Sequence, residues 1–266
     1  IFSHILFTNL CILRNLQAVK KCRIRSNFKE ILNHTHKPVT GKAAFTISGN
    51  SYDLNKEITV SGNDSVFYVE DVIALGKNVR LWDEFTPNLY TLQCDLTIRA
   101  DNANYQHSRS TTFGMREITA DKIYLNGNRI HLRGTVENAV FPKTGYAPVD
   151  DASWERVLTI LKDYGMNHMR FHSWCPPAAA FRVADKLGVY LEVEMPMWGK
   201  DAEPDEARYN FFRREQKAIL KEYGNHPSFV LYCNGNEITG NFDFIEELTH
   251  YGRTTDSRRL YSGSTA

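Results

Sequence analysis

Polar and charged residues stand at the ends of four hydrophobic runs in the second half of the chain. The four ends are Arg133-Gly134, Arg170-Phe171-His172-Ser173-Trp174, Glu192-Val193-Glu194 and Asn234-Gly235-Asn236-Glu237. A charge buried at such a place is costly unless it is paired or takes part in function. One end of this kind would be ordinary, but four in succession are hard to explain by stability. They predict a functional site that contains carboxylates, an arginine and a histidine.

A metal site is a competing interpretation for part of this set. His168, His172 and Cys175 are residue types that bind metals, and strand alternation places both histidines on one face. No fourth ligand is evident, and the five cysteines are scattered without a CxxC pair. We therefore expect no metal, no other cofactor and no disulfide framework.

The elements that must carry these ends follow a repeated pattern after Phe113. Each helical pattern is followed by a buried strand, and Gly165, Gly188 and Gly224 stand where the first three helices end. This repetition predicts βα units and a parallel sheet. The expected helices cover residues 151–164, 178–187, 209–223 and 242–251, and the expected strands cover 130–133, 167–172, 189–194, 229–233 and 259–263.

Five parallel strands fit either an open doubly wound sheet or part of an eight-stranded barrel. No glycine-rich phosphate loop follows the first strand, because Arg133-Gly134-Thr135 lacks the required spacing. A partial barrel therefore fits better. In such barrels the chemistry lies at the carboxyl ends of the strands.

The first 113 residues have a different period. Leu92, Cys94, Leu96 and Ile98 fall at every second position, as a strand with one buried face requires. Further runs rich in β-branched and aromatic residues predict strands, at residues 5–13, 19–28, 42–48, 57–60, 66–72 and 90–100. We predict a multidomain chain, with an all-β immunoglobulin-like sandwich at residues 1–113 and a partial (β/α)8 TIM barrel at residues 114–266.

Several motifs occur in an order that is typical of one enzyme family. Phe113-Gly114-Met115-Arg116-Glu117 precedes an Asn126-Gly127 pair, which is a strong hairpin signal. Asn225-His226-Pro227-Ser228 then leads to Gly235-Asn236-Glu237. This order resembles glycoside hydrolase family 2, which includes β-galactosidases, β-glucuronidases and β-mannosidases. The resemblance covers nearly the whole chain, and its Asn-Glu pair after the fourth strand is similar to the acid/base signature of the family.

The resemblance implies roles for the residues at the strand ends. Glu237 would be the general acid/base of a glycosidase, and Asn236 would bond the 2-hydroxyl group of the sugar. A carboxylic acid must protonate the departing oxygen and later deprotonate water, and the 2-hydroxyl contact strengthens in the transition state. The remaining candidates would line the sugar subsite, with the two tryptophans as stacking platforms: Arg170, His172, Glu194, Trp174 and Trp198.

Each of these roles has a structural alternative. Asn236 and Glu237 would also serve as the cap of the following helix, because asparagine and acidic residues favour that place. Arg170 and Glu194 would also form a structural ion pair, and both roles can hold at once. A tryptophan at the rim of a barrel often only packs.

The sequence departs from the family in one respect that concerns activity. In the family, the second carboxylate of a retaining glycosidase, the nucleophile, lies at the end of strand seven, and a jelly-roll domain precedes the sandwich. We expect that both lie outside these 266 residues. We therefore expect these 266 residues alone to hydrolyse nothing measurable, and the natural product to be longer. The alternatives are a non-catalytic carbohydrate-binding remnant and a structural protein with a decayed barrel.

Composition limits the partners. Lys and Arg number 32 against 31 for Asp and Glu, so no bulk charge points to nucleic acid. No apolar stretch is long enough to predict a membrane span. A carbohydrate is the expected partner, and the segments at 138–148 and 172–177 resemble bacterial family members that act on polysaccharide side chains. Such enzymes are usually exported, which favours a periplasmic or extracellular place, whereas neither the sugar nor the oligomeric state is predicted.

Overall fold

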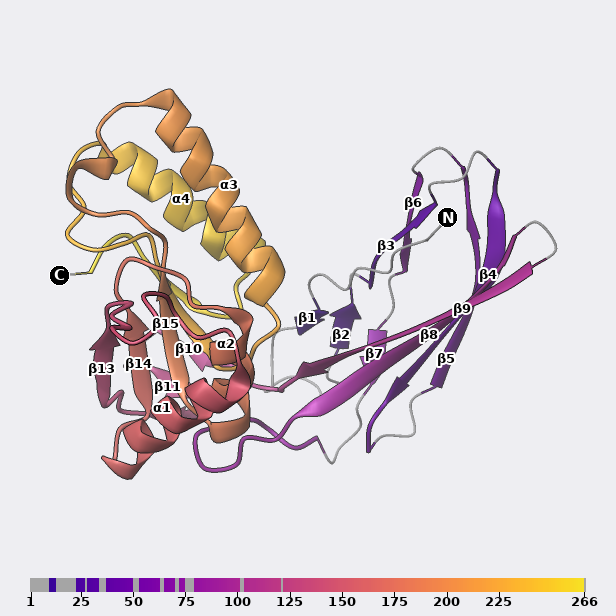
Figure 1. Cartoon of the computed structure of the whole chain (residues 1–266), viewed down its shortest axis with the longest axis horizontal. Coiled ribbons are helices and arrows are strands. Elements are labelled where there is room, and N and C mark those ends of the chain that lie inside the picture. The colour runs from indigo at the N-terminus through magenta and orange to yellow at the C-terminus, as the bar shows by residue number, and fades with distance from the viewer. Residues whose placement is uncertain are drawn as a thin grey trace. The chain divides into compact units, whose positions relative to one another are not determined.

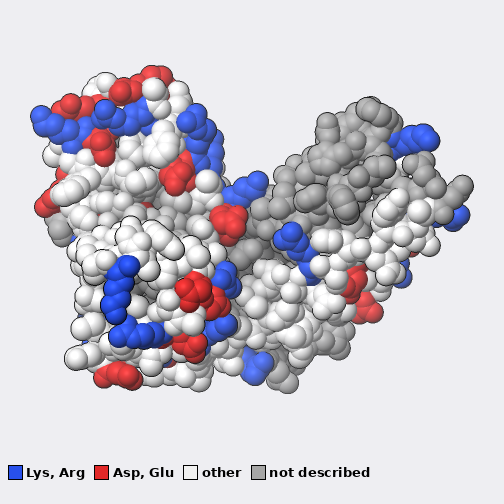
Figure 2. All heavy atoms as spheres, in the orientation of Figure 1, with Lys and Arg blue, Asp and Glu red and all other residues white. Residues whose placement is uncertain are grey.

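The computed structural model describes residues 10–12, 23–26, 28–33, 37–49, 53–62, 65–69, 72–74, 79–100, 103–120 and 122–265. The chain divides into two compact units (Figure 1). One unit comprises Ile1–Arg80 with Leu89–Phe113, and the other comprises Leu81–Asn88 with Gly114–Ala266. None of the described helices has both the length and the hydropathy of a membrane-spanning segment. Lys and Arg are interspersed with Asp and Glu on the face that Figure 2 displays.

The first unit is built from antiparallel strands. Its largest sheet has the order β5-β4-β8-β9, formed by Asp53–Val60, Val39–Ile47, Tyr90–Ala100 and Ala103–Phe113. The predicted alternation in β8 is confirmed, because its apolar residues at 92, 94, 96 and 98 are all buried. Two smaller sheets are also antiparallel. In one, β3 (Phe28–Asn33) pairs with β6 (Ser65–Val69). In the other, β2 (Arg23–Ser26) lies between β1 (Leu10–Ile12) and β7 (Val72–Ala74). The expected runs 5–13 and 19–28 lie partly outside the described residues.

The second unit begins with the predicted Asn-Gly hairpin. Strands β11 (Tyr124–Leu125) and β12 (Asn128–Arg129) pair across a two-residue turn, and β10 (Ile118–Thr119) extends the sheet. Asn126 and Gly127 have φ values of 53° and 79°, as the favoured hairpin turn requires at both central positions. The hairpin prediction is therefore confirmed.

A parallel sheet of five strands forms the centre of the second unit. Its strands lie in chain order, β13 (Gly134–Glu137), β14 (His168–Phe171), β15 (Tyr190–Glu194), β16 (Phe229–Cys233) and β17 (Leu260–Ser262). Helices follow the first four strands, α1 (Asp151–Asp163), α2 (Ala178–Leu187), α3 (Glu206–Tyr223) and α4 (Phe242–Thr255). The order never reverses, so these five strands contain no switch point of the doubly wound kind.

Local chemistry sets the limits of these helices. The Asp150 side chain accepts a hydrogen bond from the Ser153 amide and begins α1. Gly188 ends α2 with φ of 71°, a left-handed conformation that glycine adopts freely. The helices bury apolar residues such as Trp154 and Phe181 against the sheet, in one core with Phe171.

The predicted first strand of the sheet is wrong by four residues. Residues 130–133 lie in no strand, and β13 covers Gly134–Glu137 instead. The Arg133 amide and Nε bond Asn167 and Gly165, which places Arg133 beside the amino end of β14. Strand β13 is an edge strand whose first three residues are exposed, and this is why hydrophobicity gave no signal for it.

Candidate functional site

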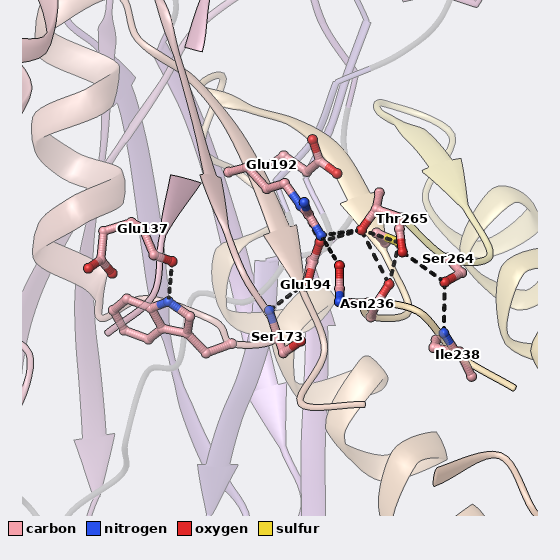
Figure 3. A network of polar contacts seen from close by, with 12 residues as sticks. Glu137, Ser173, Glu192, Glu194, Asn236, Ile238, Ser264 and Thr265 are labelled. Atoms are coloured by element: carbon pink, nitrogen blue, oxygen red, sulfur yellow. Dashed lines mark hydrogen bonds and ion pairs between the residues drawn. The ribbon is translucent and has the colours of Figure 1, made fainter. Parts of the chain in front are cut away.

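The carboxyl ends of four neighbouring strands and the segments after them bring Glu194, Asn236 and Thr265 together (Figure 3). All three residues are bonded by the side chain of Arg170. Its Nε lies 2.6 Å from Glu194 Oε1, in an ion pair with little solvent exposure. Its Nη2 donates to Asn236 Oδ1 and to Thr265 Oγ1, each at 2.6 Å. The structure therefore brings together three of the residues predicted from the sequence, and it adds Thr265.

Glu194 is fully buried, and its carboxylate has three donors. Besides Arg170, the Thr265 hydroxyl donates to Oε1 and the Ser173 amide donates to Oε2, each at 2.6 Å. Ser173 reaches this position with φ of 56°, which is unusual for a residue with a side chain. The structural ion pair between Arg170 and Glu194 is therefore present, and it fixes the place of Asn236.

Glu237 directly follows Asn236, but its surroundings differ. Asn236 is buried, whereas the Glu237 side chain is exposed. The Glu237 amide donates to the Thr265 carbonyl at 2.7 Å, and φ of Glu237 is 49°. Holding a non-glycine residue in this region costs about 1–2 kcal/mol, and such strain tends to occur at functional sites.

The helix-cap alternative for these two residues is wrong. Helix α4 begins at Phe242, and its cap is Asn241, which accepts hydrogen bonds from the amides of Asp243 and Phe244. Asn236 and Glu237 lie several residues ahead of that helix and take no part in its first turn.

Main-chain hydrogen bonds extend the sheet beyond the ends of its strands. The Asn236 amide donates to the Met197 carbonyl at 3.0 Å, and the Gly199 amide donates to the Asn236 carbonyl at 3.3 Å. On the other side, the Thr265 amide donates to the Gly235 carbonyl at 3.0 Å. A Cβ atom on Gly235 would lie 1.9 Å from the Met197 oxygen, so only glycine allows this approach.

The aromatic candidates differ in their contacts. Trp198 is 56% exposed, and its indole Nε1 donates to Glu237 Oε2 at 3.1 Å. The His172 ring lies edge-on to it, with centroids 5.6 Å apart. Trp174 is half-buried, donates to the main-chain carbonyl of Glu137 and packs edge-on against Phe171. The contacts of Trp174 are those of a packing residue, whereas Trp198 leaves a ring open to solvent.

A second carboxylate of β15 was not chosen from the sequence. Glu192 lies two residues before Glu194 on the same face of the strand, with Oε2 3.6 Å from Nε2 of His168. Burial, together with the neighbouring Glu194 charge, raises the pKa of Glu192 to about 7. Burial and then the Arg170 charge lower the pKa of His168 to about 4. Two glutamates at alternate positions of an otherwise apolar strand were the available signal.

The metal interpretation receives no support from the described side chains. In the described part of the chain, no three His, Cys, Asp or Glu side chains are grouped so as to hold a metal ion. His168 faces Glu192, and His172 faces the Trp198 ring. The arrangement instead presents one exposed carboxyl group beside a fixed amide and an open indole. A carboxyl group in such a place can donate and accept protons, and the other two groups suit a ring that carries hydroxyl groups.

Comparisons with known proteins agree with one another. Residues 20–116 match the model of the glycosyl hydrolases family 2. A β-galactosidase of Thermoanaerobacterium thermosulfurigenes is 26% identical over 245 residues, which are 88% of this chain and 32% of that protein. The crystal structure of a Bacteroides uniformis β-glucuronidase covers 94% of this chain at 20% identity, with a TM-score of 0.79.

A second β-glucuronidase of Bacteroides uniformis was solved with cyclophellitol-6-carboxylate aziridine covalently bound, and it matches 97% of this chain at 21% identity and a TM-score of 0.77. The chain spans about a third of the length of each of these relatives. The likeness to the solved structures extends over both units and concerns the fold. The match of residues 20–116 to the family model and the similarity to the β-galactosidase support the resemblance of this chain to glycoside hydrolase family 2.

Proposed function

We propose that this chain carries half of the active site of a retaining β-glycosidase, with Glu237 as the general acid/base. The observation that carries the proposal is the place of Glu237, exposed at the end of β16 beside a buried Asn236. The Arg170–Glu194 ion pair fixes the Asn236 amide oxygen, so the Nδ2 group remains to bond a sugar hydroxyl. His172 and Trp198 would form a wall of the sugar subsite, with Trp174 behind them.

The proposed fold is an immunoglobulin-like sandwich at residues 1–113 and a partial TIM barrel at residues 114–266. Five parallel strands in chain order, each of the first four followed by a helix, support it. A complete barrel needs three more such strands, and the relatives are long enough to supply them.

In the proposed reaction, Glu237 gives its proton to the glycosidic oxygen while the bond from that oxygen to the sugar carbon breaks. A second carboxylate, about 5 Å away and on a later strand, attacks the sugar carbon. Glu237 then takes a proton from the water that releases the sugar. The covalent inhibitor on the related β-glucuronidase supports a mechanism that passes through a glycosyl-enzyme.

The test begins with the reading frame that contains these residues. Sequencing of the source DNA across both ends defines the complete product, which is then assayed with aryl β-galactosides, β-glucuronides and β-mannosides. Glu237→Gln should lower turnover by about two to four orders of magnitude, as loss of a general acid/base does. Glu203→Gln is the matched control, because Glu203 is also an exposed glutamate and forms a surface ion pair with Lys200.

Two outcomes would contradict the proposal. Turnover that Glu237→Gln leaves at the wild-type rate would remove Glu237 from the chemistry. Sugar binding without any turnover in the complete product would favour the non-catalytic carbohydrate-binding alternative. Binding without turnover by the 266 residues alone is the expected result, because the proposed nucleophile lies on a later strand.

A further inference from the structure

The four tryptophans differ in what their indole N–H groups bond. Trp82, Trp154 and Trp174 donate to main-chain carbonyl oxygens at 2.7–3.1 Å. Trp198 alone among the four donates to a carboxylate, Oε2 of Glu237, at 3.1 Å. A buried indole must find a protein acceptor, but an indole as exposed as that of Trp198 has water available. The bond to Glu237 therefore meets no need of the fold.

Hydrogen bonds hold the backbone on both sides of this contact. The Trp198 amide donates to Asp201 Oδ2 at 2.9 Å, and the Asp201 amide donates back to the Trp198 carbonyl at 3.2 Å. Trp198 also forms an isolated parallel bridge with Asn236, the residue before Glu237. The two side chains therefore project from backbones that are joined to each other, and little conformational freedom is lost when they meet.

We propose that Trp198 is a positioning residue that holds Oε2 of Glu237 and leaves Oε1 to exchange the proton with the substrate. The carbonyl oxygen of a carboxylic acid is a better acceptor than its hydroxyl oxygen, so a hydrogen bond from the indole to Oε2 favours the acid form with its proton on Oε1. After the proton leaves, the carboxylate keeps its orientation through a charge-assisted bond. The inference rests on the proposed function of Glu237 and assigns a second role to Trp198 beside stacking.

The hydrogen bond between the Trp198 indole and Glu237 can be followed by NMR in the absence of turnover. The chain is labelled with 15N, and its indole resonances are followed from pH 3.5 to 8, with the Trp198 signal assigned by Trp198→Phe. We expect the Trp198 signal to move with pH over this range and to lose that movement in Glu237→Gln. The groups that also face Trp198 are Asp201 and His172, and His172→Gln identifies any movement that comes from the histidine.

The other three indoles are internal controls. Their main-chain acceptors do not titrate, so their signals should stay nearly constant, and dispersed signals show that each variant is folded. A Trp198 signal that is independent of pH, or that moves equally in wild type and Glu237→Gln, would overturn the proposal.

The role in catalysis is tested in the complete enzyme with two leaving groups. Trp198→Phe keeps a ring for stacking and removes only the donor. We expect about a tenfold loss of kcat for an alkyl glycoside, which needs protonation, as for one lost bond to a charged group. A 2,4-dinitrophenyl glycoside, whose departure needs no proton, should lose much less, whereas equal losses for both would contradict the proposal. If Glu237→Gln leaves turnover intact, the proposed function fails; if only the indole coupling is absent, the positioning role alone fails.

Discussion

The neighbours His168 and Glu192 should make opposite contributions to the pH dependence of stability. Burial, with the Glu194 charge, raises the pKa of Glu192 from 4.5 to about 7, so the folded chain holds this proton more tightly than the unfolded chain. Its stabilising contribution is complete below pH 4.5 and is lost as the pH rises to about 7. The difference between the two pKa values corresponds to about 3 kcal/mol.

His168 acts in the opposite sense. Burial, with the Arg170 charge, lowers the pKa of His168 from 6.5 to about 4, so the folded chain favours the neutral ring. Its stabilising contribution is present above pH 6.5 and is lost as the pH falls to about 4. The difference between these two pKa values again corresponds to about 3 kcal/mol of unfolding free energy. Between pH 4.5 and 6.5 the two trends oppose each other and nearly cancel.

Single substitutions should reveal each trend. Relative to wild type, the free energy of unfolding of Glu192→Gln should rise with pH between 4.5 and 7, and that of His168→Gln should fall over nearly the same range. Urea unfolding followed by tryptophan fluorescence measures this in the second unit alone, because that unit contains all four tryptophans. If both differences stay constant with pH, the burial-driven shifts are refuted.

Three further predictions concern the same unit, each measured by urea unfolding. Glu194→Gln should lower the free energy of unfolding by about 3–5 kcal/mol, because it leaves a buried arginine unpaired. Glu247→Gln, which breaks an exposed pair with an arginine, should lower it by about 1 kcal/mol or less. Gly235→Ala should lower the free energy of unfolding by at least about 2 kcal/mol, because the added Cβ would lie 1.9 Å from a carbonyl oxygen. At Gly127 the added Cβ meets nothing, so Gly127→Ala should lower it by about 1 kcal/mol, for the positive φ alone. Burial would raise the pKa of Asp256, but two arginines hold it well below its usual range, so Asp256→Asn should destabilise strongly at pH 7 and less as the pH falls below 4. A cost for Asp256→Asn that does not change with pH would contradict that reasoning.

The helices and central strands could be predicted because each has its own periodicity and end signals. Helix α2 and strand β16 begin and end at the predicted residues. Strand β9, Ala103–Phe113, was missed because its polar residues are nearly all exposed and show no alternation. It is a strand because it pairs with β8 along its whole length, and pairing between segments leaves no trace in either sequence alone. Strand β13 lies four residues later than predicted for the same reason, because its pairing with β14, and not its own sequence pattern, defines it.

The meeting of Arg170, Glu194 and Asn236 could be predicted, because parallel strands place their carboxyl ends at one edge. The role of Thr265 could not, since it lies after the last strand in a short segment without pattern, and only the folded backbone brings its hydroxyl between Arg170 and Glu194. The contact between the Trp198 indole and Glu237 likewise depends on how two loops are joined.

The main-chain bonds beyond the strand ends constrain how this site can vary in length. Trp198, Asn236 and Thr265 are bridged side by side, so inserting one residue ahead of any of them would change the register and turn its side chain to the opposite face. The described segment at residues 138–149 forms no such bridge, and apart from the packing of Phe141 and the bond from Trp154 to Pro148 its bonds between main-chain atoms are internal, from the amides of Thr144 and Gly145 to Phe141. Insertions and deletions among relatives should therefore gather in that segment, where the length of the chain can change without moving Glu237, the proposed acid/base.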